Sequence, residues 1–368
     1  MSIVPRVAYN EGMVDYKKLL GRRRRRGNTG KKTRDKQGKV VGVGKKVRSW
    51  FSKLARAMLR IVLGVAVVGL AIGLVAGWWW WRGGTWNGVN RVSVLVGDRE
   101  TGEVRLYSYQ GGALGGMDAV VVNLGRDVLV DVAHGYGGYR LGVLPELGRQ
   151  EGYGSKLLAE TVEIWLGVKV TGVIEVAKLA SVDSGRQQWQ QFRSVLWTVG
   201  DNSVPVGDRW QLWWQSRGLS SSQMVNFDLI EGAVYEPKTL PDRTVVYNVR
   251  ENKLDVLVNS YLADGLVRQR SEVGVAVVNT TGRKGLAKRV ARMLTNTGYD
   301  VVGISDSDEV LEDSKVLAEG QVMADKPFLY PAEEMMGVEA QEAPLVGKYR
   351  AWVVVMLGKD MEKRFYER

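Results

Sequence analysis

One uncharged run limits what this chain can fold into. Residues 61–81, IVLGVAVVGLAIGLVAGWWWW, contain no charged side chain. Because an α-helix rises ~1.5 Å per residue, such a run spans the ~30 Å hydrocarbon layer of a bilayer. A cleaved signal peptide would have a shorter apolar core followed by small residues, whereas bulky tryptophans follow here. The sequence therefore predicts an uncleaved single transmembrane helix over residues 58–82.

The charges are distributed unevenly around this run. Residues 1–60 carry 19 Lys and Arg against 3 Asp and Glu, and the remaining residues carry 33 against 37. Lysine and arginine stay on the cytoplasmic side of a membrane. We therefore expect a single-pass protein of the cell membrane. Residues 1–57 would form a basic, disordered cytoplasmic tail, and the C-terminal domains would be extracytoplasmic.

The tail contains the run GRRRRRG at residues 21–27. Clustered cations beside a membrane attract anionic lipid at ~1 kcal/mol each. Nucleic acid would bind through the same electrostatics. However, no aromatic side chains alternate with these arginines, and no folded nucleic-acid-binding motif is visible. Contact with membrane lipid is therefore favoured over nucleic acid.

Two further patterns belong to the apolar run. Indole rings prefer the headgroup level of a membrane, which predicts membrane anchoring by Trp86 and by the preceding run Trp78, Trp79, Trp80 and Trp81. Gly69, Gly73 and Gly77 are spaced by four and share one helix face, so two helix backbones would approach closely there. This face is a candidate for homodimer formation.

The region after the run alternates between strand and helix patterns. Residues 91–110 predict a β-hairpin, with Asp98 and Arg99 as solvated turn residues, and residues 118–132 predict further strand. Ser155 is expected to cap a helix that ends at Gly167, before a strand over 168–176. The leucine, valine and tryptophan stripe of this helix is Leu158, Val162 and Trp165.

This order predicts an α/β (α+β) fold, with two extracytoplasmic domains of mixed sheet and helix behind the anchor. The first domain is expected over residues 88–235. A connecting strand and helix follow over 236–271. The second domain is expected over 272–362, where an apolar strand, a helix ending at Gly298 and a valine-rich strand suggest a crossover unit. Its helix would bury Leu286, Val290, Met293 and Leu294.

The first domain resembles the LytR-CpsA-Psr family. The resemblance rests on GRDVLVDVAHGYGGYRLG and on GSKLLAETVEIWLGVKVTGVIEV. It implies transfer of a glycopolymer from a lipid pyrophosphate carrier to the cell wall, with arginines, aspartates and magnesium at the pyrophosphate. Arg126 and Asp127 match the family's Arg-Asp pair, and Arg140 is a candidate to assist them.

The resemblance is incomplete, so the domain is interpreted as degenerate. The family's upstream Arg-Ser-Asp-Thr strand opening is missing. Its later arginine-rich helix is replaced by RQQWQQFRSVLWTVG and DRWQLWWQSRGLSS. The helical spacing of Trp210, Trp213 and Trp214 predicts a packed face there. Phosphoryl transfer needs several cationic groups around the leaving pyrophosphate, which one arginine and one aspartate do not supply.

The second domain resembles the LytR C-terminal domain. The matching stretches are VAVVNTTGRKGLAKRVARMLTNTGYDVVGI and VVVMLGKDME. The loop NTTGRKG precedes a helix N-terminus, where free N–H groups favour anions. Thr280, Thr281, Arg283 and Lys284 are therefore candidate ligand-binding residues, although a plain helix entry would use the same residues.

The remaining candidates favour structure over chemistry. The only histidine, His134, lies in a glycine-rich stretch and is interpreted as a turn residue. The absence of cysteine excludes disulfides and thiolate zinc sites. No residues have metal-ligand spacing, and no cofactor is expected unless the chain is a transferase using magnesium. The acidic segments 305–321 and 332–344 are expected to be solvated surface.

Three functions remain for such a chain. The first is a membrane-anchored, non-catalytic cell-envelope protein whose outer domains bind or organise wall polymer or envelope proteins. The second is an active glycopolymer transferase that uses Arg126 and Asp127. The third is a membrane tether that binds nucleic acid through its basic tail.

Overall fold

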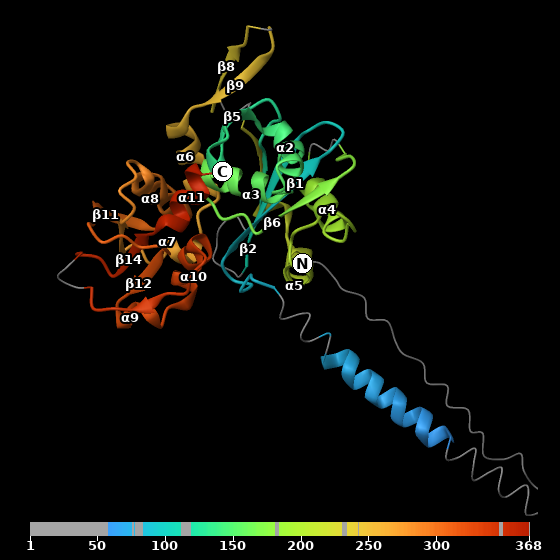
Figure 1. Cartoon of the computed structure of the whole chain (residues 1–368). Helices are drawn as coiled ribbons and strands as arrows, with labels where there is room; N and C mark the ends of the chain where they lie inside the picture. Colours follow the sequence, from blue (N-terminus) through green and yellow to red (C-terminus); the bar gives the residue numbers. More distant parts are fainter. Residues whose placement is uncertain are drawn as a thin grey trace, which may run out of the picture. The chain divides into compact units, whose positions relative to one another are not determined.

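The computed structural model describes residues 58–75, 77, 84–111, 119–180, 184–229, 234–241, 243–345 and 349–367 (Figure 1). The predicted basic tail and the anchoring run Trp78 to Trp81 lie outside these residues. The described part of the apolar run is a helix, Met58–Val75, which is long and apolar enough to cross a membrane. The glycines of its four-residue repeat are open, since a Cβ at any of them would meet no other atom within 4 Å.

Residues 70–368 form one compact unit built around two five-stranded sheets. In the first sheet the strand order is β6-β1-β2-β3-β7. The predicted hairpin over residues 91–110 is confirmed as the antiparallel pair β1 and β2, whose turn uses Gly102 at φ +73°. The strands are β1 (Arg91–Asp98), β2 (Val104–Gln110), β3 (Ala119–Asn123), β6 (Gly172–Val176) and β7 (Met224–Asp228).

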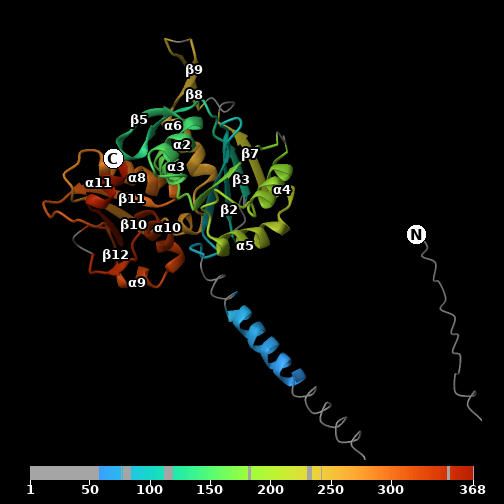
Figure 2. The same cartoon turned by 45° about the vertical axis from the view of Figure 1, so that its right-hand side comes forward.

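Both faces of this sheet are buried, because its side chains alternate between two apolar clusters. Leu95 belongs to the cluster on one face, and Val94 and Val96 belong to the cluster on the other. Helix α3 (Lys156–Leu166) covers the first face, while α4 (Gly185–Val195) and α5 (Val206–Gln215) cover the second (Figure 2). The first domain is therefore a three-layer α/β arrangement.

Helix α3 follows its sequence pattern with one exception. Its predicted apolar stripe is buried, and Gly167 ends it in the left-handed region at φ +72°. Ser155 precedes the helix, but its side chain makes no capping hydrogen bond because its backbone is already helical. The predicted strand over 118–132 is interrupted: β3 ends at Asn123, and residues 129–132 form a separate strand.

That separate strand is half of a two-stranded hairpin, β4 (Leu129–Val132) with β5 (Gly137–Arg140). The short helix α2 (Leu144–Gln150) follows it. A second hairpin, β8 (Tyr235–Thr239) with β9 (Val245–Val249), lies where a single connecting strand was expected. Two helices then lead to the second domain, α6 (Glu251–Tyr261) and α7 (Gly265–Arg268).

The second sheet has the order β11-β10-β14-β12-β13. The predicted crossover is confirmed: β10 and β11 are parallel and α8 connects them, with its four predicted apolar residues buried. Gly298 ends α8 at φ +117°. The elements are β10 (Gly274–Asn279), α8 (Leu286–Thr297), β11 (Asp300–Asp306), β12 (Lys315–Ala318), α9 (Gly320–Met323), α10 (Lys326–Met336), β13 (Gln341–Glu342), β14 (Val353–Leu357) and α11 (Lys359–Tyr366).

The two acidic segments were wrongly expected to be solvated throughout. Segment 305–321 contains β12, whose Val316 and Ala318 are fully buried against β14. Segment 332–344 begins inside α10, which buries Met335 and Met336. Acidic residues precede β12 in the chain and lie within α10, so the acidic composition of the two segments hid the buried apolar residues.

The two sheets share one continuous apolar cluster. It includes residues of α3 and of the first sheet together with residues of α6, α8, β10 and α11. At the join, Asn296 of α8 donates to the carbonyl of Leu166 at the end of α3, over 2.9 Å. Arg292 donates to the carbonyl of Trp165 over 3.1 Å. The first-domain helix and the C-terminal domain are thus joined by packing and by hydrogen bonds.

Candidate functional site

The fold brings Arg126, Asp127 and Arg140 together. Arg126 Nε lies 3.1 Å from Asp127 Oδ2, and Arg140 Nη1 lies 3.4 Å from Asp127 Oδ1. The β4–β5 register places Arg140 opposite Leu129, which returns it to the side of Asp127. Arg126 also donates to the carbonyl of Thr101 over 3.1 Å. All three side chains are exposed or half-exposed.

This arrangement does not fit a magnesium ion. Both carboxylate oxygens of Asp127 face arginine nitrogens, so neither is available to a cation. Within the described ranges, no group of three or more His, Asp or Glu side chains has the geometry to hold a metal ion. We therefore derive no step that uses magnesium.

Asp98 and Arg99 differ from the expected solvated turn residues. Asp98 is buried and accepts hydrogen bonds from the backbone N–H groups of Glu100, Thr101 and Leu179. Burial raises its pKa, but these hydrogen bonds outweigh burial and hold the pKa below its usual value. Arg99 is half-exposed and pairs with Glu175 over 3.0 Å. Asp98 closes the β1–β2 turn and has no oxygen free for a ligand role.

The loop NTTGRKG is ordered mainly by its own hydroxyl groups. Thr280 is buried and donates to the carbonyl of Leu357 over 2.7 Å. The Thr281 hydroxyl donates to Asn279 and accepts the backbone N–H of Arg283. Lys284 and the guanidinium of Arg283 are exposed, and that guanidinium lies 4.6 Å from the ring centre of Tyr366. The two threonines thus shape the loop, and the two cations remain on the surface.

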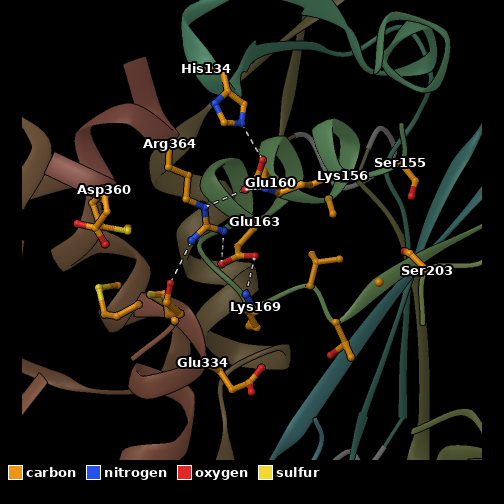
Figure 3. A pocket seen from close by; sticks show the side chains of 18 of the residues that line it. His134, Ser155, Lys156, Glu160, Glu163, Lys169, Ser203, Glu334, Asp360 and Arg364 are labelled. Carbon is orange, nitrogen blue, oxygen red and sulfur yellow. Dashed lines mark hydrogen bonds and ion pairs between the residues drawn. The ribbon is translucent and has the colours of Figure 1, made fainter. Parts of the chain in front are cut away.

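A polar cavity lies elsewhere, between α3, α10, α11 and the start of β6 (Figure 3). Its volume is about 720 Å³. At its centre Arg364 of α11 lies 2.8 Å from Glu163 and 3.5 Å from Glu160, both on α3. Lys169 completes the row at 3.5 Å from the other oxygen of Glu163. We call Glu160, Glu163, Lys169 and Arg364 the charged cluster.

Sequence reasoning missed this cluster. Glu160 and Glu163 share one face of α3 by their spacing of three, but that spacing is also common on solvated helices. Arg364 is some two hundred residues away in the chain. Its side chain becomes a partner only because α11 packs against the first domain, which no local pattern reveals.

His134 lies at the rim of the cavity and is the turn residue that the sequence predicted. Its backbone has φ +59°, in the left-handed region. Its Nε2 lies 2.8 Å from a Glu160 oxygen and its Nδ1 lies 3.2 Å from the carbonyl of Glu367. A carbonyl oxygen and a carboxylate both accept, so both ring nitrogens are directed at acceptors. Neither nitrogen is placed to remove a proton from a substrate.

No dashed line in Figure 3 reaches Glu334 of α10, which also lines the cavity. Burial raises the pKa of its carboxyl; Lys169 lowers it, and the like charges of Asp208 and Glu163 raise it. For Arg364, burial lowers the pKa of the guanidinium, but Glu163 and Glu160 outweigh burial and raise it. The cavity therefore contains a paired cation and a carboxyl group whose charged form is disfavoured by burial.

The second sheet lies in a region that matches a known protein family. Residues 272–360 match the family model LytR_C, described as LytR cell envelope-related transcriptional attenuator. The C-terminal part of the chain is therefore a LytR_C domain. No curated protein matches the chain.

Three solved structures are similar to parts of the chain. The LytR-CPS2A-psr family protein YwtF (TagT), determined with bound octaprenyl pyrophosphate lipid, is 16% identical, with 46% of this chain and 88% of that chain covered and a TM-score of 0.28. TagU of B. subtilis is 12% identical, with 46% and 94% covered and a TM-score of 0.28. A transcriptional regulator from Enterococcus faecalis is 11% identical, with 57% and 88% covered and a TM-score of 0.34. These values are too low to assign an activity.

The LytR_C domain contributes one wall of the cavity through α10 and α11, and the first domain contributes the other through α3. The serines that line it offer no nucleophile with a base: Ser203 donates to the carbonyl of Val173 and accepts that residue's N–H. Ser155 is not hydrogen-bonded to the histidine at the rim, whose nitrogens both face other acceptors. The arrangement suits binding of a polar group, and it suits joining the LytR_C domain to the first domain.

Proposed function

We propose that this chain is a single-pass, membrane-anchored cell-envelope protein whose outer domains bind without catalysis. The relation of the LytR_C domain to the cell envelope supports the compartment. The helix Met58–Val75 supports the anchor. The ligand that we propose is cell-wall polymer or another envelope protein.

One observation carries the non-catalytic part of the proposal. Arg126, which matches the family's Arg-Asp pair, and Arg140, the candidate to assist it, both pair with Asp127 at an exposed turn. None of the three lines the cavity between the domains. Transfer from a pyrophosphate requires several preorganised cations directed at the leaving group. Here two cations are instead directed at one carboxylate.

A transfer assay tests this directly. Full-length protein in detergent micelles would be incubated with a polyprenyl-pyrophosphate-linked glycan, a wall-glycan acceptor and magnesium, and phosphate release would be measured. We expect release no faster than in a protein-free control. Release that Arg126→Ala abolishes, and that the exposed-arginine control Arg186→Ala leaves intact, would establish the transferase instead.

The topology is a separate part of the proposal. The excess of cations before the span supports an N-terminus in the cytoplasm and a LytR_C domain outside. Protease added to intact cells should remove an epitope at the C-terminus and spare one at the N-terminus. The reverse pattern, or loss of neither epitope, would refute this orientation.

We further propose that exposed cations of the LytR_C domain contribute to ligand binding. Arg283 and Lys284 lie side by side at the entry to α8, and Lys288 lies one turn further along the same helix. Purified wall fragments added to the full chain should raise its melting temperature. Arg283→Ser with Lys284→Ser should reduce that rise, whereas Lys238→Ser, which removes an exposed cation of strand β8, should leave it unchanged.

The glycine face of the span supports a homodimer. Gly69, Gly73 and Gly77 leave a side-chain-free stripe on the described helix. Energy transfer between donor- and acceptor-labelled copies in vesicles should fall with Gly73→Ile. Gly64→Ile is the matched control, because this glycine lies outside the four-residue repeat and is equally open. Equal loss in both variants, or in neither, would remove the support.

A further inference from the structure

Helix α5 exposes tryptophans where a packed face was expected. Leu212 is buried beneath the helix, but Trp210 is 43% exposed and Trp214 is 59% exposed. Trp197, in the turn that follows α4, is 42% exposed and meets Trp210 edge-on. The expectation was therefore wrong for two of the three tryptophans of α5, since only Trp213 is mainly covered. We call Trp197, Trp210, Trp213 and Trp214 the tryptophan face.

The four indoles form one contiguous surface. The ring of Trp210 is stacked on those of Trp213 and Trp214, with centroids 5.6 Å and 6.2 Å away, and meets Trp197 edge-on at 6.2 Å. The guanidinium of Arg217 lies 4.8 Å from the ring of Trp213 and 5.4 Å from that of Trp214. The face is therefore ordered, aromatic and cationic at one edge.

Such a surface is costly in water. Large contiguous apolar patches on a soluble domain mark interaction sites. Indole rings have a large apolar body and one N–H donor, and they concentrate at the headgroup level of membranes. An arginine beside them suits anionic headgroups, which attract basic side chains near the surface.

Helix α5 is bound to the segment that follows the apolar run in the sequence. Asp208, in the first turn of α5, accepts hydrogen bonds from the backbone N–H groups of Thr85 and Trp86. Gln215, the last residue of α5, donates to the carbonyl of Gly88 over 3.1 Å. Both ends of α5 are thus bound to the segment that directly follows the apolar run. Figures 1 and 2 place α5 at the same end of the body as that segment.

The length of the connecting chain limits the distance between the end of the apolar run and α5. Thr85 is four residues after Trp81, so it lies within ~14 Å of the end of the run at ~3.5 Å per residue. Helix α5 is ten residues long, which adds ~15 Å at most. Trp86 takes no part in this face: the expectation that it anchors at the headgroups is wrong, because it is buried and donates to the carbonyl of Asn90.

We infer that the tryptophan face is a second membrane contact, which rests in the headgroup layer of the bilayer that the chain's own helix crosses. This inference depends on the anchor in the proposed function. It would fix the tilt of the outer domains with two attachments in place of one. The occupant is a phospholipid surface, and stacking of wall-glycan sugars on the indoles is the competing outcome.

Site-specific labels test it, because the chain has no cysteine of its own. Gly218→Cys places a label next to Arg217 and keeps every indole, and a Cβ there meets no atom within 4 Å. Gly138→Cys in β5 is the matched control, because it is equally open and β5 lies at the other end of the body in both views (Figures 1 and 2). Leu70→Cys reports on the span.

Each single-cysteine protein would carry a bimane label in vesicles of phosphatidylcholine and phosphatidylglycerol. We expect the labels at 70 and 218 to be quenched by brominated lipid and shielded from iodide, and the label at 138 to behave oppositely. A label at 218 that iodide reaches, with the label at 70 quenched by lipid, would overturn the membrane contact and leave the anchor intact. A label at 70 that iodide reaches would refute the anchor and the contact together.

Variants of the face complete the test. In the double variant Trp210→Ser with Trp214→Ser, iodide should quench the label at 218, while brominated lipid should still quench the label at 70. Val256→Ser with Val310→Ser removes exposed apolar side chains elsewhere, at 66% and 59% exposure, and should change neither label. In micelles without vesicles, wall glycan that shields the 218 label from iodide would assign the face to sugar and overturn the lipid contact.

Discussion

Arg364 Nη2 lies 2.8 Å from Glu163 Oε1, and this ion pair joins the last helix of the LytR_C domain to α3 of the first domain. Only 2% of the Glu163 side chain and 15% of the Arg364 side chain are exposed. The contact lacks hydrogen-bond geometry, and Arg364 instead donates to the carbonyl of Met335 over 3.0 Å. The pair is therefore held by charge and by the packing of α11.

Removing the cation of this pair should destabilise the fold strongly. Arg364→Met would leave two buried glutamates without their main cation, and breaking a buried pair from one side costs about 3–5 kcal/mol. Urea unfolding of the full chain in micelles would measure the free energy of unfolding. The exposed neighbour substitution Lys363→Met should cost little. Adding Glu163→Gln to Arg364→Met should recover part of the loss, and no recovery would argue that packing, not charge, holds α11.

Glu334 should make stability depend on pH in a particular direction. Its carboxyl has a pKa raised mainly by burial, so the fold disfavours the charged form. Its contribution is fully present below its unfolded-state pKa and is lost as pH rises through the folded-state pKa. Glu334→Gln should therefore melt higher than wild type at neutral pH, and the difference should vanish near pH 4.

Glu146 is a control for this pH dependence, because its pKa is shifted in the opposite direction to that of Glu334. Hydrogen bonds from Arg149 lower the pKa of this exposed carboxyl, so its contribution is present at neutral pH and is lost on acidification. Glu146→Gln should not melt higher than wild type at neutral pH. If both glutamine variants gained stability equally, burial of Glu334 would not be the cause.

The sequence predicted those elements whose pattern is local. Helix α8 repeats apolar residues at helical spacing and ends at Gly298, and both features are visible in the letters alone. The β1–β2 hairpin is likewise set by alternation around Gly102. In these elements the stretch that forms the structure also contains its turn or end signal, so tertiary contacts add little information.

What could not be predicted depends on partners that are distant in sequence. Trp210 and Trp214 have the spacing of a buried stripe, but Leu212 is the residue of α5 that packs toward the sheet, and the two indoles remain 43% and 59% exposed. Periodicity shows that a face exists and does not show whether another element covers it. The charged cluster is similar, since the contact of Arg364 with α3 joins residues that are distant in the sequence.

Asp208 should prove important for the segment that follows the span. Burial raises the pKa of its carboxyl although three hydrogen bonds from Thr85 and Trp86 lower it. Asp208→Ala leaves two backbone N–H groups without their acceptor, which should cost about 1–3 kcal/mol in unfolding free energy. Asp208→Asn keeps one acceptor oxygen and should cost less. The exposed Asp308→Ala is the control, and an equal effect there would contradict the role of Asp208.

Gly167 should tolerate substitution less well than Gly137, a glycine whose backbone is also in the left-handed region. Both Gly167, at φ +72°, and Gly137, at φ +85°, are left-handed, so alanine at either should cost roughly 1–2 kcal/mol in strain. At Gly167 a Cβ would also lie 3.1 Å from Met293 Cα and 2.8 Å from Asn296 Nδ2, whereas at Gly137 it meets nothing within 4 Å. Overpacking of this kind costs about a further 1–3 kcal/mol. In urea unfolding, Gly167→Ala should therefore have a lower free energy of unfolding than Gly137→Ala. Equal losses would mean that α3 and α8 do not approach each other as closely as the fold requires.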